Sequence, residues 1–115
     1  MQYLLLIHSD ETAMKSAPPE ASSQMTAAYM AYTEALSKAG ILLGGNRLRP
    51  TDMTTTVRIT GGKTQVLDGP YAETKEQLAG YYLIDVANLD AALSWAARCP
   101  GASHGAIEVR PIWIM

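Results

Sequence analysis

The sequence predicts an α+β fold in which two helices cover one face of an antiparallel sheet that carries an inserted β-hairpin. Three observations lead to this fold class. Several short runs are apolar or β-branched, as strands are. Two longer segments repeat apolar residues at helical spacing. Their order is strand, helix, strand, hairpin, strand, helix, strand, which is a ferredoxin-like plan with an insertion. The 115 residues show no repeat or linker, so we expect one domain, residues 1–115.

The first half of the chain predicts a strand, a long helix and a second strand. Residues 3–7 are continuously apolar, which is typical of a buried strand. From Met25 to Ala39, apolar residues recur every three or four positions, which predicts a helix of about five turns ended by Gly40. Residues 41–43 predict the second strand, broken by Gly44-Gly45.

The second half predicts the hairpin, two further strands and a helix. Residues 54–67 form a hairpin in this interpretation, because β-branched runs flank Gly61-Gly62. Residues 79–86 and 105–114 predict strands. Residues 89–99 predict the second helix, which ends before a Pro-Gly pair.

Composition and charge exclude several classes of function. A net charge of −2 and scattered basic residues leave no electrostatic footprint for nucleic acid, so no nucleic-acid partner is expected. The apolar run near the N-terminus is too short to span a bilayer, so neither a signal peptide nor a membrane partner is expected. Cys99 is the single cysteine, which favours a reducing cytoplasm and a structural position at a helix end.

The connector at residues 68–78 carries an unusual density of opposed charge. Asp68 precedes Gly-Pro, a turn signal, and can either brace that turn or act as a base. Glu73, Lys75 and Glu76 can bind a ligand, or they can form one helical turn with ordinary surface pairing. The connector is therefore the first candidate region for a site.

The last strand holds the second group of candidates. Alternation places Ile107 and Val109 on one face and Glu108 with Arg110 on the other. Opposite charges on a central strand are costly to bury unless they are paired or solvated. One hypothesis is a polar cleft in which Arg110 binds a carboxylate or phosphate and Glu108 orients it or acts as a base. The alternative is a salt bridge between subunits.

Histidine and aromatic residues complete the candidates. His8 closes the first strand and, near an acidic residue of the connector, would form an acid-base pair; the alternative is a structural strand-end residue. Tyr81 or Tyr82 would shape the pocket, with Arg47 as one wall. The spacing of the histidines and carboxylates matches no metal-ligand pattern, so no metal is expected.

Five segments, in the right order, carry a resemblance to a known family. They are Tyr3–Ile7 with Asp10-Glu11, Asp68–Glu76, Gly80–Ile84, Ala96–Pro100 and Gly105–Pro111. The chain resembles the YCII-related family along almost its whole length, and specifically the branch named for an Asp-Gly-Pro-Phe motif. Tyr71 stands where that branch has its Phe, and His8 stands where Tyr is common in relatives.

The resemblance implies a dimeric α/β barrel without a tightly bound cofactor. Similar proteins in that superfamily include small isomerases, monooxygenases and dehalogenase-like enzymes. A His-Asp pair has been proposed as the active site of YCII-like proteins. Relatives in this branch are often linked to extracytoplasmic-function sigma factors, which implies a regulatory or sensing role.

Two functional hypotheses follow. In the first, the chain is a cytoplasmic homodimer, because an uncovered apolar sheet face is rare on a monomer. Its cleft binds a small anionic organic molecule and supports acid-base chemistry of an isomerase or hydrolase kind. In the second, it is a non-catalytic protein that interacts with a sigma-factor-linked partner. A third hypothesis is a cofactor-free monooxygenase.

Overall fold

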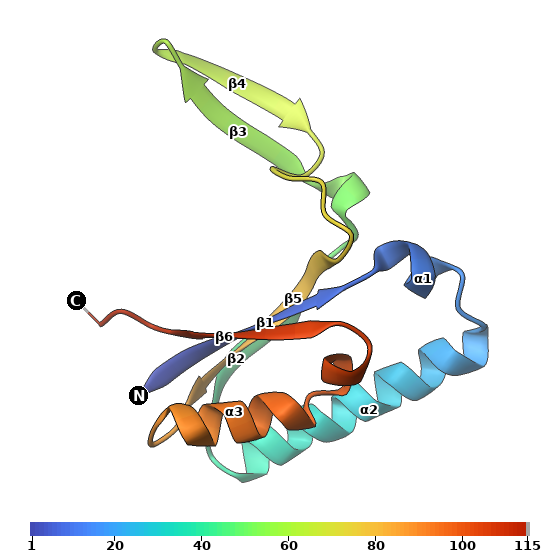
Figure 1. Cartoon of the computed structure of the whole chain (residues 1–115), viewed down its shortest axis with the longest axis vertical. Helices are drawn as coiled ribbons and strands as arrows, with labels where there is room; N and C mark the ends of the chain where they lie inside the picture. The colour runs from blue at the N-terminus through green and yellow to red at the C-terminus, as the bar shows by residue number, and fades with distance from the viewer. Residues whose placement is uncertain (115) are drawn as a thin grey trace.

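The computed structural model describes residues 1–114 and shows a four-stranded antiparallel sheet with helices on one face (Figure 1). The sheet order is β2-β5-β1-β6, and every neighbouring pair is antiparallel. The strands of this sheet are β1 (Gln2–Ser9), β2 (Leu42–Arg47), β5 (Gln77–Asp85) and β6 (Ala106–Pro111). The helices are α1 (Glu11–Lys15), α2 (Pro19–Lys38) and α3 (Leu89–Arg98), with short 3-10 turns η1 (Thr51–Met53) and η2 (Pro100–Ser103). The ferredoxin-like α+β prediction is confirmed.

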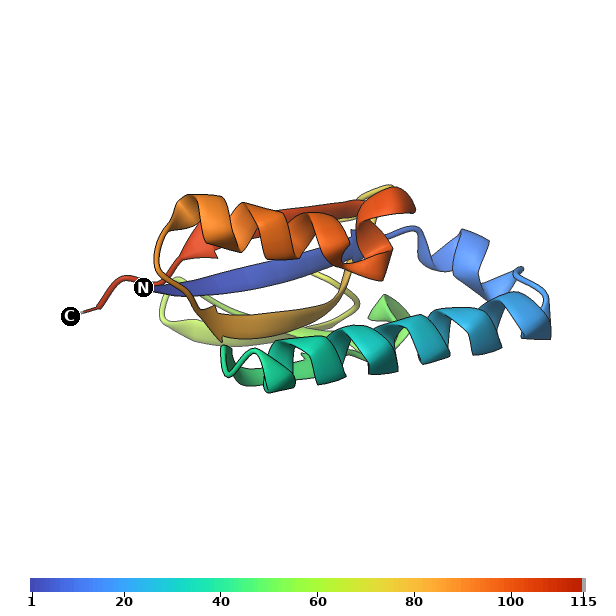
Figure 2. The same cartoon turned by 90° about the horizontal axis from the view of Figure 1, so that it is seen from below.

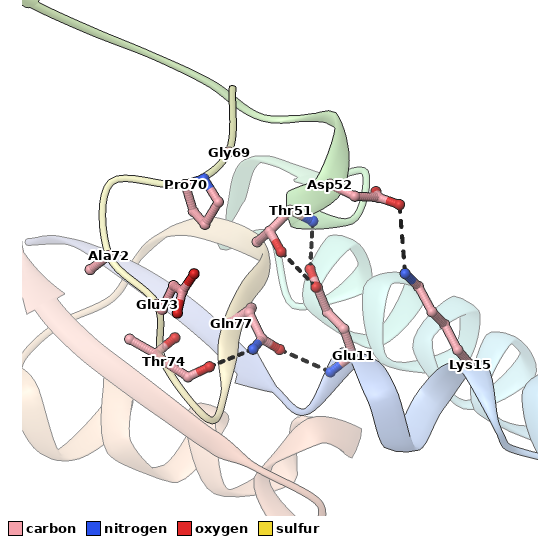
Figure 3. Close-up of a pocket in the computed structure, with 10 residues that line it drawn as sticks. All are labelled: Glu11, Lys15, Thr51, Asp52, Gly69, Pro70, Ala72, Glu73, Thr74 and Gln77. Atoms are coloured by element: carbon pink, nitrogen blue, oxygen red, sulfur yellow. Dashed lines mark hydrogen bonds and ion pairs between the residues drawn. The ribbon is translucent and has the colours of Figure 1, made fainter. Parts of the chain in front are cut away.

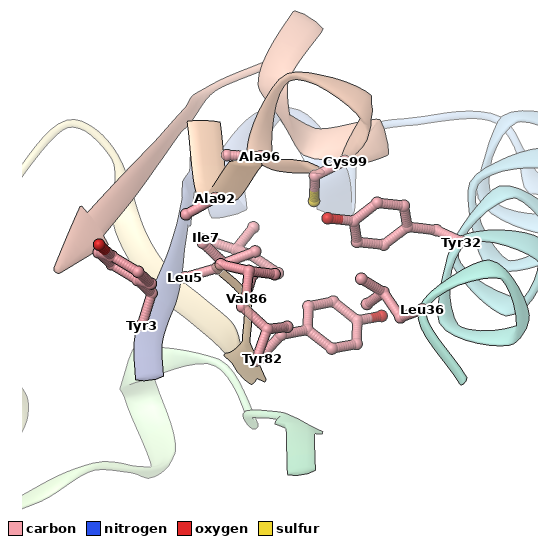
Figure 4. Packing of buried hydrophobic residues seen from close by; sticks show 11 residues of the cluster. Tyr3, Leu5, Ile7, Tyr32, Leu36, Tyr82, Val86, Ala92, Ala96 and Cys99 are labelled. Carbon is pink, nitrogen blue, oxygen red and sulfur yellow. The ribbon is translucent and has the colours of Figure 1, made fainter. Parts of the chain in front are cut away.

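The two long helices, α2 and α3, lie side by side on the same face of the sheet (Figure 2). The core is the layer between them and the inward-facing strand residues (Figure 4). Leu5 on β1, Ile84 on β5 and Leu36 on α2 are completely buried there. Burying each of these side chains contributes about 1.5–3 kcal/mol to folding. Every second residue of β1 faces this layer, which leaves the alternate residues on the opposite face.

The hairpin of β3 (Thr55–Thr60) and β4 (Lys63–Asp68) is a separate two-stranded sheet. Gly61 and Gly62 make its turn with positive φ angles of 58° and 77°, as a two-residue hairpin requires. It stands on the side of the main sheet away from the helices (Figure 1). The radius of gyration is 16.0 Å, whereas a compact domain of this length has about 13 Å. The hairpin therefore projects from the body of the molecule.

Three details differ from the sequence prediction. Residues 11–15 form the short helix α1, which was not predicted, and the Asp10 side chain caps it by accepting hydrogen bonds from the amides of Thr12 and Ala13. Strand β2 continues through Gly44-Gly45 instead of ending there. A Cβ at Gly45 would lie 2.8 Å from the Tyr81 backbone oxygen, so glycine permits the close pairing of β2 with β5. Strand β6 is shorter than predicted and spans residues 106–111.

Candidate functional site

The face of the sheet opposite the helices carries a regular grid of side chains, here called the open face. Leu6 of β1 lies between Tyr81 of β5 and Glu108 of β6. Leu4 of β1 lies between Leu83 of β5 and Arg110 of β6. Because neighbouring strands are about 4.8 Å apart, Tyr81 and Glu108 stand about 10 Å from each other across Leu6. The open face thus has an apolar centre with polar groups on both sides.

His8 and Glu108 meet on this face. The Nε2 atom of His8 lies 2.5 Å from Oε1 of Glu108. This is ion-pair distance, but the two groups are not aligned as a hydrogen bond, and Nε2 itself is shielded from solvent. The His8 side chain is 24% exposed and that of Glu108 is 57% exposed. An imidazole in contact with a carboxylate can accept or donate a proton at neutral pH, which is the chemistry of a general acid-base pair.

Local backbone features place His8 at this point. The register of β1 and β5 shifts between Ile7 and His8, so Ala79 is an extra residue on β5. Such bulges redirect side chains and are frequent beside active sites. On the other side, a Cβ at Gly105 would collide with the backbone oxygen of His8, so glycine lets β6 begin close to β1. The regular register of β1 with β6 pairs His8 with Ala106, so Glu108 is the diagonal neighbour of His8 on the open face.

Arg110 and Tyr81 extend the polar part of the open face. Arg110 is two residues from Glu108 on the same strand face, about 7 Å along β6. Within residues 1–114, no carboxylate lies at ion-pair distance from the Arg110 guanidinium. The Tyr81 hydroxyl accepts a hydrogen bond of 3.0 Å from Nδ2 of Asn46 on β2. An anion bound above Leu4 and Leu6 would therefore lie between the unpaired guanidinium of Arg110 and the hydroxyl of Tyr81, which Asn46 holds in place.

The structure places four of the residues predicted from the sequence on one face of the sheet and places the other predicted residues elsewhere. His8, Glu108, Arg110 and Tyr81 share the open face. Tyr82 does not, because its side chain enters the core and its hydroxyl forms a 2.6 Å hydrogen bond with Oγ1 of Thr33. Burial raises the pKa of Tyr82, and the Thr33 hydrogen bond opposes that shift.

The remaining candidates lie around the base of the hairpin. Asp68 ends β4 and Arg47 ends β2, and both are exposed. Glu73 and Lys75 are exposed in the connector, which has no helical turn, so that part of the prediction is wrong. The connector instead follows bends up to Gln77.

The connector lines a hollow of about 300 Å³ at the base of the hairpin (Figure 3). Its polar groups bond mainly to one another. The Glu11 carboxylate accepts two 2.7 Å hydrogen bonds from the backbone amide and hydroxyl of Thr51. Gln77 accepts one of 3.0 Å from the Glu11 amide, and Lys15 lies 3.7 Å from Asp52.

This hollow is better explained as a brace for the hairpin than as a reactive site. Both carboxylate oxygens of Glu11 are already committed to Thr51, the residue that begins η1 and leads into β3. Sequence reasoning missed Glu11, Thr51 and Gln77, because their partners are 40 and 66 residues apart. The only sequence feature that pointed to this region was the Asp10-Glu11 pair directly after a strand, because acidic residues there are typical of a helix start.

Neither the remaining histidine nor the cysteine joins the open face. His104 lines an apolar hollow of about 380 Å³ between α2 and η2. Cys99 is buried beneath the helices, and burial raises the pKa of its thiol, which stays neutral at physiological pH. Cys99 thus lies buried at the end of α3, the helix-end position that the sequence predicted. Across the described residues, no group of three or more metal-ligating side chains is close enough to hold a metal ion.

The fold and the open face define a small α+β protein of ferredoxin-like topology with a contacting histidine and glutamate on the side of its sheet opposite the helices. The model of the YCII-related domain matches residues 1–115. The chain is also 41% identical over 114 residues to an uncharacterised protein of Rhizobium meliloti (strain 1021), covering 97% of this chain and 92% of that protein. The chain belongs to the YCII-related family. Among residues 1–114, no helix is long and apolar enough to cross a membrane.

Proposed function

We propose that the chain works as a cytoplasmic homodimer whose open faces meet and enclose a cleft for a small anionic organic molecule. The observation that carries the proposal is the His8–Glu108 contact beside the uncommitted Arg110. Charged side chains on a strand face are costly to bury unless they have a partner, so a bound anion is a natural partner for Arg110. The single, buried Cys99 agrees with a reducing cytoplasm.

In this proposal each polar residue has a separate role. Arg110 binds the carboxylate or phosphate of the ligand by its planar guanidinium. Glu108 takes a proton from the ligand or orients it, with His8 as the group that receives and returns the proton. Tyr81 limits the cleft on the β5 side and Leu6 forms its floor. Proton transfer of an isomerase kind, or a hydrolytic step, is the chemistry that these groups support.

Binding and chemistry can be separated by two variants. The ligand would first be identified by native mass spectrometry of protein purified gently from its own host. Arg110→Ala should weaken binding of that anion tenfold to a hundredfold in calorimetry, because a charged hydrogen bond contributes about 1.5–3 kcal/mol. Glu108→Gln should preserve binding within about threefold and abolish turnover. Lys38→Ala is the matched control, because Lys38 is an exposed cation on α2, on the other side of the sheet.

The proposal is contradicted if Arg110→Ala and Glu108→Gln leave both binding and turnover unchanged in a folded protein. The two residues would then be structural, as in the intersubunit salt-bridge alternative. A bare protein at its calculated mass would direct attention to protein partners instead.

A second candidate is a non-catalytic protein that regulates, or is regulated by, an extracytoplasmic-function sigma factor, as the resemblance to the Asp-Gly-Pro-Phe branch implies. The exposed apolar side chains of the projecting hairpin favour a protein-binding role. Its test is co-purification from the native cell. A sigma factor recovered in stoichiometric amount supports this candidate, and recovery of the homodimer alone contradicts it.

A further inference from the structure

The β3–β4 hairpin lacks the packing that a hairpin needs. Both of its strands are exposed along almost their whole length. Within residues 1–114 its extensive contacts are those between β3 and β4 themselves. A two-stranded hairpin on its own is at best marginally stable in water. A partner that covers the hairpin would supply the packing that residues 1–114 do not provide.

One face of the hairpin is apolar. Val57 of β3 lies directly opposite Val66 of β4, and Ile59 shares their face. Their exposed fractions are 59%, 62% and 73%. The opposite face carries Arg58, Lys63 and Gln65 with Leu67. The three residues Val57, Ile59 and Val66, here called the hairpin triplet, are thus an exposed apolar patch that nothing else in residues 1–114 covers.

The total exposed surface points to the size of the missing partner. The chain exposes 8093 Å², whereas a compact monomer of 12.4 kDa exposes about 6,000 Å². The difference, about 2,000 Å², exceeds the 800 Å² or so that each partner buries in a standard interface, and it suits a permanent homodimer.

The arrangement of the hairpin favours a second copy of this chain as that partner. Helices α2 and α3 lie on one side of the main sheet and the hairpin rises on the other, beside the open face (Figures 1 and 2). The molecule is flat, 47 × 44 × 18 Å, with the sheet and the hairpin at an angle to each other. Two such copies related by a two-fold axis would each place a hairpin against the other. This single self-complementary contact would cover both the hairpin triplet and the apolar centre of the open face.

We propose that the hairpin triplet packs on a second copy of the chain, so that each subunit uses its hairpin as an arm that closes the side of its partner's open face. Asp68 lies on the same hairpin face as Val66, so this contact also carries Asp68 toward the partner. The inference rests on the proposed homodimer and assigns the surface that holds it together. It also gives the Glu11–Thr51 brace a role, because that brace fixes the base of the arm.

The test replaces the triplet by threonine, which keeps strand propensity and removes apolar contact. Sedimentation velocity of the full chain should show a dimer for the wild type. The dissociation constant of the dimer should be at least about a hundredfold higher for the variant Val57→Thr/Ile59→Thr/Val66→Thr. The control Lys63→Thr/Gln65→Thr changes the other hairpin face and should keep the wild-type dimer. Circular dichroism verifies that each variant is folded.

Hydrogen exchange of residues 55–68 provides a second readout. Their amides should be protected at protein concentrations where the dimer forms and exchange rapidly after dilution to monomer. If the wild type is a dimer and the triplet variant dimerises equally well, the proposed role of the hairpin is wrong, and the cleft proposal is unaffected. A monomeric wild type would overturn both. A triplet variant that dissociates, in a protein that binds no anion, would support the arm and contradict the cleft.

Discussion

The two faces of the main sheet are built from the same strands and have opposite characters. On the helix side, Leu5 of β1 and Ile84 of β5 are completely buried. The residues next to them in sequence, Leu6 and Leu83, face the open side and are only partly buried. The helix side supplies the packing that holds the fold together. The open side carries the His8–Glu108 pair, which lies outside the buried core.

The difference shows how one sheet can combine a closely packed face with a polar one. Because strand residues alternate, a single strand serves both faces without compromise. The polar groups lie on the face that α2 and α3 leave uncovered (Figures 1 and 2). Four substitutions or conditions test how complete this separation is.

The largest expected effect is Leu5→Ala on the buried face. It should lower the free energy of unfolding by about 2–5 kcal/mol, because it leaves a cavity between β1 and the helices. Leu6→Ala, its neighbour on the open face, should cost less than half as much. Urea denaturation of the two variants at a concentration that keeps the chain monomeric makes the comparison. Equal losses would show that the open face is as important for folding as the core.

The next effect concerns glycine at the start of β6. Gly105→Ala should destabilise the chain by about 1–3 kcal/mol, because its Cβ would collide with the backbone oxygen of His8. The matched control is Gly44→Ala in β2, where a Cβ meets nothing within 4 Å. Thermal unfolding of the two variants measures the difference. A neutral Gly105→Ala would contradict the close approach of β6 to His8.

The tyrosines of the helix side predict a loss of stability in alkali. Burial raises the pKa of Tyr29 and of Tyr32 well above the ordinary value of 10.0. Their stabilising effect is complete below pH 10, the pKa in the unfolded chain, and declines above it because the unfolded tyrosines lose protons first. Urea unfolding at pH 10.5 should therefore give a free energy about 1–2 kcal/mol lower than at pH 8. Tyr32→Phe should reduce this dependence, and a free energy that rises with pH in this range would contradict the burial.

The smallest expected effect is that of Glu108→Gln on folding. The pair with His8 is largely exposed at the carboxylate, and such pairs contribute about 0–1 kcal/mol. The free energy of unfolding should change by less than about 0.5 kcal/mol in chemical denaturation. A loss above 2 kcal/mol would show that the pair stabilises the fold, and the case for a separate functional face would be weaker.

Several parts of this molecule were predictable because their signals are local. Alternation along β6 placed Ile107 and Val109 opposite Glu108 and Arg110, and the structure agrees. Gly61-Gly62 marked the hairpin turn, since both residues need positive φ. Helical spacing located α2 and α3, and the order of elements gave the fold class and topology.

Other parts required the tertiary structure. The sequence linked His8 to the acidic connector, but in the folded chain His8 meets Glu108, 100 residues away, through the register of β1 with β6. It also offered Tyr81 and Tyr82 equally for one pocket, and burial separates them. By itself the sequence therefore determined the main strands and the two long helices, their order and the residues that share a strand face, but not the short helix α1. Register and packing decided which of these residues meet, because contacts between distant strands depend on the alignment of whole elements and not on local pattern.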